Sequence, residues 1–244
     1  MLAGKSVVVT GGTGAIGKAI VRATARYGAN VAFTFHKSAD DAAALAQELA
    51  KGNVRCIYAQ VAGNDNAAVE TFIADAEKEF GRVDVLVNNL GATQVMPFAL
   101  IDEADWDDMM SVNLKSMFLF SKAVVRGMIR QRSGAIVNLG SIAGQRMLEV
   151  PVHYATAKAG VIGFTTSLAK ELCRYGIRVN GVVPGLIEGG IGTNVSDRQL
   201  ADYNRFCSLG RTGKPEEVAE LVAFIASDRA SYMNAQMVVI DGGL

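Results

Sequence analysis

The residues with the most informative spacing are a serine, a tyrosine and a lysine in the second half of the chain. Ser141 stands thirteen residues before Tyr154, and Lys158 stands four residues after it. The run 150–170 has the pattern of one amphipathic helix, and residues four apart on a helix share a face. A cation beside a phenol lowers a tyrosine pKa that is otherwise near ~10. The spacing therefore predicts a tyrosine that exchanges a proton with a carbonyl oxygen, which the serine hydroxyl holds.

The tyrosine–lysine pair alone leaves two interpretations open, because a surface lysine covering a packed tyrosine has the same spacing. The elements that would position the pair favour a site. Short β-branched runs alternate with helical stretches, and several runs are apolar almost throughout, as in a parallel sheet covered on both faces. The expected strands are 7–9, 31–35, 54–58, 83–87, 135–139, 177–183 and 237–240, with helices such as 15–27, 40–51 and 66–80 between them.

This strict β-α alternation predicts the α/β fold class. We expect one doubly wound, Rossmann-type domain over residues 1–244, with a seven-stranded, mostly parallel sheet flanked by helices. The glycine-rich stretch 184–195 is long for a loop inside a compact domain, which is typical of a lid or binding loop. We place this substrate loop at about 184–210.

Composition excludes several classes of protein. The 244 residues carry 24 acidic and 24 basic side chains, which argues against a general nucleic-acid binder. No apolar run approaches the roughly 18 residues that cross a bilayer, and the first residues enter a strand with no leader pattern, so we expect a cytoplasmic protein that does not bind membranes. Cys56, Cys173 and Cys207 form no metal or redox motif and read as reduced thiols.

The first expected strand runs into a glycine turn, TGGTGAIG, that opens a helix. Gly12, Gly14 and Gly17 fit the G-x-G-x-x-G pattern of dinucleotide-binding turns. The glycines let the backbone approach a pyrophosphate, and the helix N-terminus supplies N–H groups and positive charge. The expected cofactor contacts here are Gly11, Gly12, Thr13, Gly14, Ala15, Ile16 and Gly17.

The end of the second expected strand bears on the choice of cofactor. An NAD site usually has an acid there for the ribose 2′-hydroxyl, but the segment 34–38 is TFHKS. His36 and Lys37 can instead meet a 2′-phosphate, which favours NADP(H) over NAD(H). In the alternative interpretation, Lys37 is simply solvated, while Asp40 and Asp41 cap the next helix.

These motifs, in this order, resemble the short-chain dehydrogenase/reductase family over essentially the whole chain. The further matches are NNLG at 88–91, Asn113 within SVNLKSMF, the Ser141, Tyr154 and Lys158 set, Pro184-Gly185, and IDGG at 240–243. Length and these matches indicate the compact branch of the family. Three positions depart from its pattern: Ala15 and Leu90 replace a glycine and an alanine, and Gln60 replaces an aspartate that binds the adenine amino group.

The resemblance implies a role for each matching residue. Tyr154 is expected to be the acid in reduction and the base in oxidation, and Lys158 to hold the nicotinamide ribose and lower the Tyr154 pKa. Ser141 is expected to donate to the substrate carbonyl, and Asn113 to anchor a water that links Lys158 to solvent. Implied cofactor contacts, besides the turn and the pair, are His36, Lys37, Gln60, Val61, Asn88, Gly91, Pro184, Gly185 and Ile187.

Within the family the chain is most similar to 3-oxoacyl-acyl-carrier-protein reductases, through the stretches 154–172 and 210–228. Expected substrate contacts are Ser141, Gln145, Met147, Leu148 and Tyr154. This mostly apolar lining with a serine hydroxyl suits a neutral or lipophilic ketone. Arg146 reads as either a substrate contact or a surface residue, and His153 as a substrate contact or as a capping or packing residue.

Partners and competing functions are inferred from the same resemblance. Arg132 matches one of the basic positions that would receive an acidic acyl carrier protein. The other falls on Tyr175, with Arg174 beside it, although an arginine near a helix end also complements the helix dipole. A carbonyl reductase without a carrier protein, an NAD-linked alcohol or diol dehydrogenase, and a non-catalytic nucleotide sensor are the alternatives. The family and the apolar residues on several faces of the helix expected at 106–130 suggest a homotetramer, unless that helix is simply buried.

Overall fold

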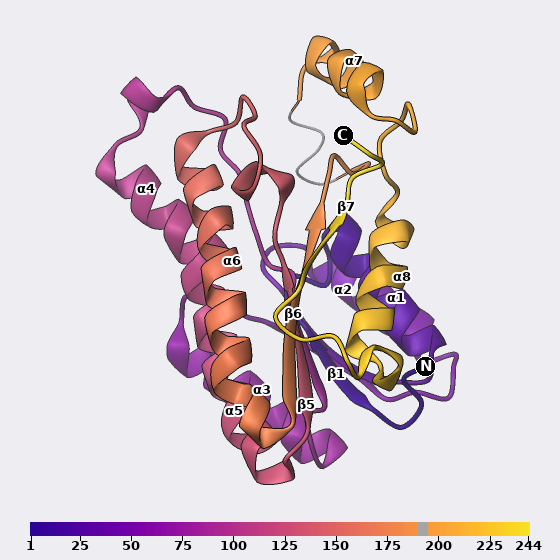
Figure 1. Cartoon of the computed structure of the whole chain (residues 1–244). Coiled ribbons are helices and arrows are strands. Elements are labelled where there is room, and N and C mark those ends of the chain that lie inside the picture. Colours follow the sequence, from indigo (N-terminus) through magenta and orange to yellow (C-terminus); the bar gives the residue numbers. More distant parts are fainter. Residues whose placement is uncertain (190–194) are drawn as a thin grey trace.

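Seven parallel strands form a single sheet in a computed structural model that describes residues 1–189 and 195–244 (Figure 1). Their order across the sheet is β3-β2-β1-β4-β5-β6-β7. All six pairings are parallel, so the expectation of a mostly parallel sheet was too cautious. The strands are β1 (Ser6–Val9), β2 (Asn30–Phe35), β3 (Cys56–Gln60), β4 (Val85–Asn88), β5 (Gly134–Leu139), β6 (Ile177–Pro184) and β7 (Met237–Ile240).

Helices cover both faces of this sheet (Figure 1). One face carries α1 (Ala15–Arg26), α2 (Ala39–Leu49) and α8 (Pro215–Ala226), and the other carries α3 (Asn66–Phe80), α5 (Ser116–Gln131) and α6 (Val152–Leu172). Val7 and Val9 of β1 enter the first of these two cores, and Val8 enters the second. Burial on both sides is the reason that most strand positions are apolar.

All expected strands and the three expected helices that were given lie within two residues of their observed bounds, and the third strand, β3, is displaced by two residues at both ends. It was expected at 54–58 but spans Cys56–Gln60. The backbone N–H of Arg55 donates to the side-chain oxygen of Asn30 at 2.9 Å, and pairing with β2 then runs from Val31–Cys56 to Phe35–Gln60. The partner strand therefore sets the register, which local residue pattern does not reveal.

The single helix expected at 106–130 is in fact two helices. α4 (Glu103–Met110) and α5 are joined by one π-helical turn, η2 (Ser111–Lys115). Met109, Met117 and Phe120 are buried, whereas Phe118 on α5 is 45 % exposed. Three of the six apolar residues that suggested an oligomer interface are therefore core residues, and Met110 and Leu114 are half-buried. No helix in the parts of the chain described is long and apolar enough to cross a membrane.

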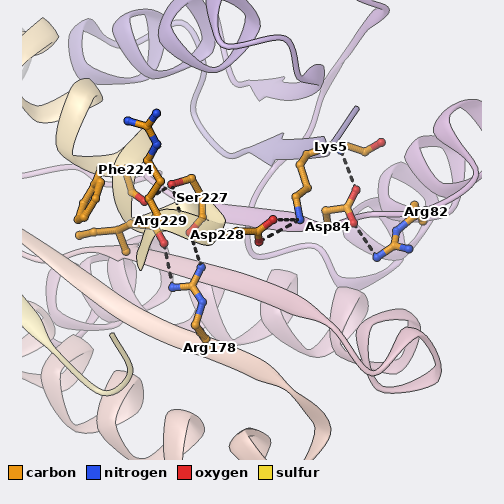
Figure 2. A network of polar contacts seen from close by, with 10 residues as sticks. Lys5, Arg82, Asp84, Arg178, Phe224, Ser227, Asp228 and Arg229 are labelled. Carbon is orange, nitrogen blue, oxygen red and sulfur yellow. Dashed lines mark hydrogen bonds and ion pairs between the residues drawn. The ribbon is translucent and has the colours of Figure 1, made fainter. Parts of the chain in front are cut away.

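A network of polar contacts joins the amino ends of the strands to the end of α8 (Figure 2). Arg178 of β6 donates to the carbonyl oxygens of Ile225 and Ser227, both at 3.0 Å. Lys5 pairs with Asp228 at 3.1 Å. These contacts satisfy carbonyl groups that the end of α8 leaves without helical partners. They fix the edge of the sheet opposite the one where the candidate residues gather.

Candidate active site

The predicted functional residues gather at the carboxyl edge of the sheet. In a parallel sheet the loops after successive strands meet at this edge, and the crevice lies where the strand order reverses, here between β1 and β4. The glycine turn comes after β1 and the NNLG segment after β4. Ser141 comes after β5, and Pro184 ends β6.

Packing within the chain requires three of the turn glycines. Gly11 has φ +67°, a left-handed conformation that favours glycine. A Cβ at Gly12 would lie 2.7 Å from the Phe33 ring, and one at Gly17 would overlap the Gly11 carbonyl oxygen. A Cβ at Gly14 would meet nothing nearer than 3.7 Å. Gly11, Gly12 and Gly17 are therefore fixed by the fold itself, whereas Gly14 is not.

The start of α1 fits a pyrophosphate. Its N-cap is Gly14, which has no side chain to cap the helix, and its first turn contains no acidic residue. The first N–H groups of a helix lack helical partners and carry partial positive charge. Ala15, the departure from the compact-branch pattern, begins this helix, and its methyl group lies beside Gly189 of the loop after β6.

Two residues that sequence analysis missed hold the turn in place. The amide Nδ2 of Asn89 donates to the carbonyl oxygens of Thr10 and Gly11, at 3.0 and 3.1 Å. The hydroxyl of Thr10 accepts from the backbone N–H groups of Asn89 and Leu90. Leu90 is another position that departs from the family pattern. Its side chain packs against Gly63, where a Cβ would lie 3.0 Å from Leu90 Cδ1. The only sequence feature that could have predicted this contact is Asn89 itself, the second asparagine of NNLG.

Asn88 lies deeper than its expected cofactor role implies. Its Nδ2 donates to Asn138 Oδ1 at 2.8 Å and to Ser121 Oγ at 3.1 Å. Asn138 in turn donates to the Thr165 hydroxyl at 2.9 Å. This buried row joins β4 and β5 to α5 and α6, so Asn88 supports the sheet edge from within.

The residues expected at the adenosine ribose meet at the ends of β2 and β3. His36 and Lys37 are exposed, and Gln60 Nε2 donates to the His36 carbonyl oxygen at 2.7 Å. That bond leaves the carbonyl oxygen of Gln60 as the side-chain atom that can accept from an adenine amino group. Val61, directly after Gln60, is buried. Asp41, in the first turn of α2, pairs with Lys18 of α1 at 3.1 Å.

Tyr154, Lys158 and Asn113 converge on Gly91. Lys158 Nζ lies 5.9 Å from the centre of the Tyr154 ring and donates to the Leu139 carbonyl oxygen at 3.1 Å. A Cβ at Gly91 would lie 3.0 Å from Asn113 Oδ1 and 3.3 Å from Lys158 Nζ. The structure thus brings the spaced tyrosine and lysine together with the helix asparagine, and the interpretation as a surface lysine is wrong because Lys158 is buried.

The π-helical turn η2 points Asn113 into this cluster. Asn113 is fully buried, and its side chain bonds both backbone groups of Ala92, at 3.3 and 3.0 Å. Asn113 therefore anchors the segment after β4. Such turns are rare and occur preferentially at functional sites.

Ser141 reaches the same edge through a tight contact with α6. Its Oγ accepts from the backbone N–H of Ala143 at 3.1 Å, at the start of the short helix η3 (Ile142–Gly144). A Cβ at Gly144 would lie 2.5 Å from the carbonyl carbon of Lys158. Gly144, which sequence analysis missed, therefore lets the serine segment rest directly on the helix that carries Tyr154 and Lys158.

Burial controls the electrostatics of the pair. It raises the pKa of Tyr154, and the hydrogen bond with Ser141 opposes this only in part. It also lowers the pKa of Lys158 to about 8. The expectation that Lys158 lowers the Tyr154 pKa is therefore not met by the chain's own groups. A phenol with a raised pKa stays protonated at neutral pH, as a proton donor must.

The expected substrate residues have mixed positions. Gln145 and Met147 are exposed and Leu148 is half-buried, so they form an open rim instead of a closed pocket. Arg146 pairs with Asp241 at 2.7 Å, which gives it a structural partner.

The stretch 184–210, expected as a loop, contains the helix α7 (Asp197–Phe206), and both its first residues and this helix contact the end of β7. Gly185 donates its N–H to the Ile240 carbonyl oxygen at 2.9 Å, and Ile187 is buried. The Tyr203 hydroxyl of α7 accepts from Leu186 N at 3.1 Å and donates to the Asp241 carbonyl oxygen at 2.9 Å. Residues 190–194 of this loop lie outside the described residues.

A doubly wound sheet with a glycine turn and a buried Tyr-Lys-Asn cluster at one edge defines the class of Rossmann-type oxidoreductases. The comparisons with known proteins name the family. A family model described as enoyl-(acyl carrier protein) reductase matches residues 11–244. The chain belongs to the short-chain dehydrogenase/reductase family of oxidoreductases.

Relatives cover the whole chain. The 3-oxoacyl-(acyl-carrier-protein) reductase of Vibrio cholerae is 38 % identical over 243 residues, which are 100 % of this chain and 98 % of the relative. The enzyme of that name from Escherichia coli is 37 % identical over 99 % of this chain and 97 % of its own.

Solved structures agree with this assignment. The short-chain dehydrogenase/reductase of Serratia marcescens has a TM-score of 0.92 at 32 % identity, covering 99 % of this chain and 98 % of its own. A dehydrogenase/reductase of Sinorhizobium meliloti has a TM-score of 0.92 at 31 % identity, covering 99 % and 95 %.

Proposed function

We propose that this protein is an NADP(H)-dependent reductase of 3-oxoacyl thioesters, with Tyr154 as the acid. The observation that carries the proposal is the meeting of Tyr154, Lys158 and Asn113 at Gly91, on the same sheet edge as the glycine turn. The names of the full-length relatives support the 3-oxoacyl substrate. We place the enzyme in the cytoplasm.

Each protein group has a separate task in this reaction. The amides at the start of α1 bind the pyrophosphate, and Lys158 and Asn113 lie beside Gly91, where a nicotinamide ribose would rest. When bound, the nicotinamide supplies hydride to the carbonyl carbon. Ser141 holds the carbonyl oxygen, and Tyr154 gives its hydroxyl proton to that oxygen as negative charge develops. Lys158, near its pKa at neutral to slightly alkaline pH, can then return a proton toward the tyrosine.

An assay with competing substrates tests this proposal. The matching family model carries the description enoyl reductase, an enzyme that reduces a carbon–carbon double bond. The named relatives are 3-oxoacyl reductases, which reduce a ketone. We therefore expect NADPH oxidation with acetoacetyl-CoA and little with crotonyl-CoA. Turnover of crotonyl-CoA alone would contradict the proposal. Activity with simple ketones but with neither thioester would indicate a carbonyl reductase, and oxidation of alcohols with NAD alone would indicate a dehydrogenase. Tight NADPH binding without any turnover would indicate a sensor.

Cofactor preference is expected to depend on the end of β2. Lys37 is exposed and lies two residues after Phe35, the last paired residue of β2, so its ammonium can reach a 2′-phosphate. We expect Lys37→Glu to raise the KM for NADPH about tenfold, because a repulsive charge replaces an attractive one, and to leave the KM for NADH nearly unchanged. Lys51→Glu, the same change at the far end of α2, is the control. A wild-type enzyme that prefers NADH would show that His36 and Lys37 were misinterpreted.

The two arginines expected to receive a carrier protein lie together but far from Tyr154. Arg132 Nη2 donates to the Arg174 carbonyl oxygen at 3.4 Å, beyond the C-terminal end of α6. Twenty residues separate Tyr154 from Arg174, or about 30 Å along a helix. A carrier protein docked there would serve the site of a second protomer more easily than this one, which is compatible with the expected homotetramer.

Charge reversal tests the carrier surface. We expect Arg174→Glu to lower kcat/KM for an acetoacetyl carrier protein about tenfold, because an acidic partner is then repelled, and to leave acetoacetyl-CoA turnover unchanged. Arg229→Glu, which changes another exposed arginine, should affect neither substrate. Equal losses with both substrates, or no loss with the carrier protein, would remove Arg174 from the docking surface.

A further inference from the structure

The histidine directly before Tyr154 is fully buried and has no task in the reaction proposed above. His153 lies in the first turn of α6, and its exposed fraction is 0 %. The N-cap of that helix is Pro151, whose side chain cannot accept a hydrogen bond. Instead, His153 Nδ1 accepts from the backbone N–H of Tyr154 at 3.0 Å. His153 therefore provides the acceptor that the cap residue lacks.

The other ring nitrogen continues a row of polar contacts to α4. His153 Nε2 lies 3.5 Å from Gln94 Oε1, and Gln94 Nε2 donates to Asp105 Oδ1 at 2.8 Å. Asp105 also forms a capping box with Asp102 at the start of α4. The row thus runs from the amide of Tyr154, across the segment after β4, to the helix that leads into the Asn113 turn.

The chemistry of its two ends fixes the direction of every bond in the row. The carboxylate of Asp105 only accepts, so Gln94 must turn its NH₂ to Asp105 and its oxygen to His153. His153 must then donate from Nε2, and Nδ1 is left as the acceptor that a backbone N–H needs. The hydrogen bond from Gln94 also holds the pKa of Asp105 below its usual range. Only a neutral imidazole with its proton on Nε2 allows every hydrogen bond in this row to form.

The same segment is anchored a second time. Asn113 bonds both backbone groups of Ala92, two residues before Gln94. Gln94 is therefore held between Asp105 and a backbone that Asn113 fixes. The row is built on positions that the fold already constrains, so it can transmit that constraint to the start of α6.

We propose that His153 is a positioning residue: through its Nε2–H tautomer, set by Gln94 and Asp105, it holds the backbone amide of Tyr154 and thereby places the reacting hydroxyl. This inference rests on the proposed role of Tyr154. Misplacement of a reacting group by about 1 Å can cost 10²-fold in rate. Loss of the amide contact should thus lower kcat, while the cofactor keeps its affinity because the glycine turn, Lys158 and Asn113 are unchanged.

Two substitutions distinguish the contribution of Nδ1 from that of Nε2. Asn places an acceptor oxygen at the position of Nδ1, and Gln places a donor NH₂ at the position of Nε2. We expect His153→Asn to keep kcat for acetoacetyl-CoA within about threefold of wild type, and His153→Gln to lower kcat about tenfold. The Kd for NADPH, measured by fluorescence, should stay within twofold for both.

The outcomes distinguish this inference from the proposed function. If wild type reduces the thioester and the two variants have equal kcat values, whether high or low, the amide contact does not position Tyr154. If wild type itself is inactive, the proposed function fails and His153 is not at issue. Should either variant not fold, Gln94→Leu at the half-buried neighbour replaces it: we expect a kcat about threefold lower with Kd unchanged, and an unchanged kcat overturns the inference.

Discussion

Replacing Tyr154 with Phe is expected to lower kcat for acetoacetyl-CoA reduction about 10³-fold. The substitution removes one hydroxyl and keeps the ring, which packs in a small buried cluster with Met109 and Ala143. Burial keeps the hydroxyl protonated at neutral pH, so it is the group able to give a proton to the developing alkoxide. Ser141 can still hold the oxygen, which leaves a residual rate. The measurement is the initial rate of NADPH oxidation.

Tyr175→Phe is the matched control for this prediction. It removes the same hydroxyl at the opposite end of α6, where Tyr175 contacts Arg174. We expect wild-type kcat for Tyr175→Phe and an unchanged Kd for NADPH in both variants. A Tyr154→Phe enzyme that retains more than about a tenth of wild-type kcat would show that another group donates the proton.

Replacing Lys158 with Met is expected to lose activity and to gain stability. Lys158 is buried, and its pKa falls from 10.5 to about 8, so at neutral pH the fold holds a charge that burial disfavours. The shift corresponds to about 3 kcal/mol. Loss of the hydrogen bond to the Leu139 carbonyl oxygen destabilises the variant by about 1 kcal/mol, which offsets part of this gain. The net gain of about 2 kcal/mol should raise Tm by about 5 °C, while kcat falls at least about 10²-fold.

The pH dependence of that gain gives a second check. Between pH 8 and pH 10.5 the unfolded state binds more protons at Lys158 than the folded state does. Wild-type stability from this group therefore rises with pH across that window, and the burial cost is fully present below it. The stability gap between Lys158→Met and wild type should narrow from pH 8 toward 10.5. Lys158→Arg, which keeps the charge, should show no gain, and a Met variant less stable than wild type at pH 7 would contradict the buried-charge argument.

The fold could be predicted because both faces of the sheet are covered. Several strands then carry apolar residues almost throughout, and seven such runs alternate with helices. The glycine turn and the Tyr154–Lys158 spacing could be interpreted for a similar reason, since both depend on residues within one or two turns of each other. Residues directly after a strand must also lie at its carboxyl end, which placed His36 and Lys37 correctly at that edge of the sheet.

Contacts between segments that are distant in the sequence could not be predicted, because they produce no local residue pattern. Asn89 reaches back to Thr10, and Gly144 rests on the backbone of Lys158, yet neither position differs locally from an ordinary loop residue. The direction of the Tyr154 pKa was also missed, because the spacing reveals the nearby lysine but not the burial that raises the pKa of Tyr154. Met147 was expected at the substrate for its place after Ser141, and it is fully exposed.

The most direct test of the central claim traces one hydrogen atom. Wild-type protein is incubated with acetoacetyl-CoA and NADPH that carries deuterium at C4 of the nicotinamide, once on each face, and the product is analysed by mass spectrometry. We predict 3-hydroxybutyryl-CoA with one deuterium at C3 from one of the two labelled cofactors, and almost none from Tyr154→Phe in the same time. Product without deuterium from both cofactors, or no product at all, would contradict direct carbonyl reduction at this site.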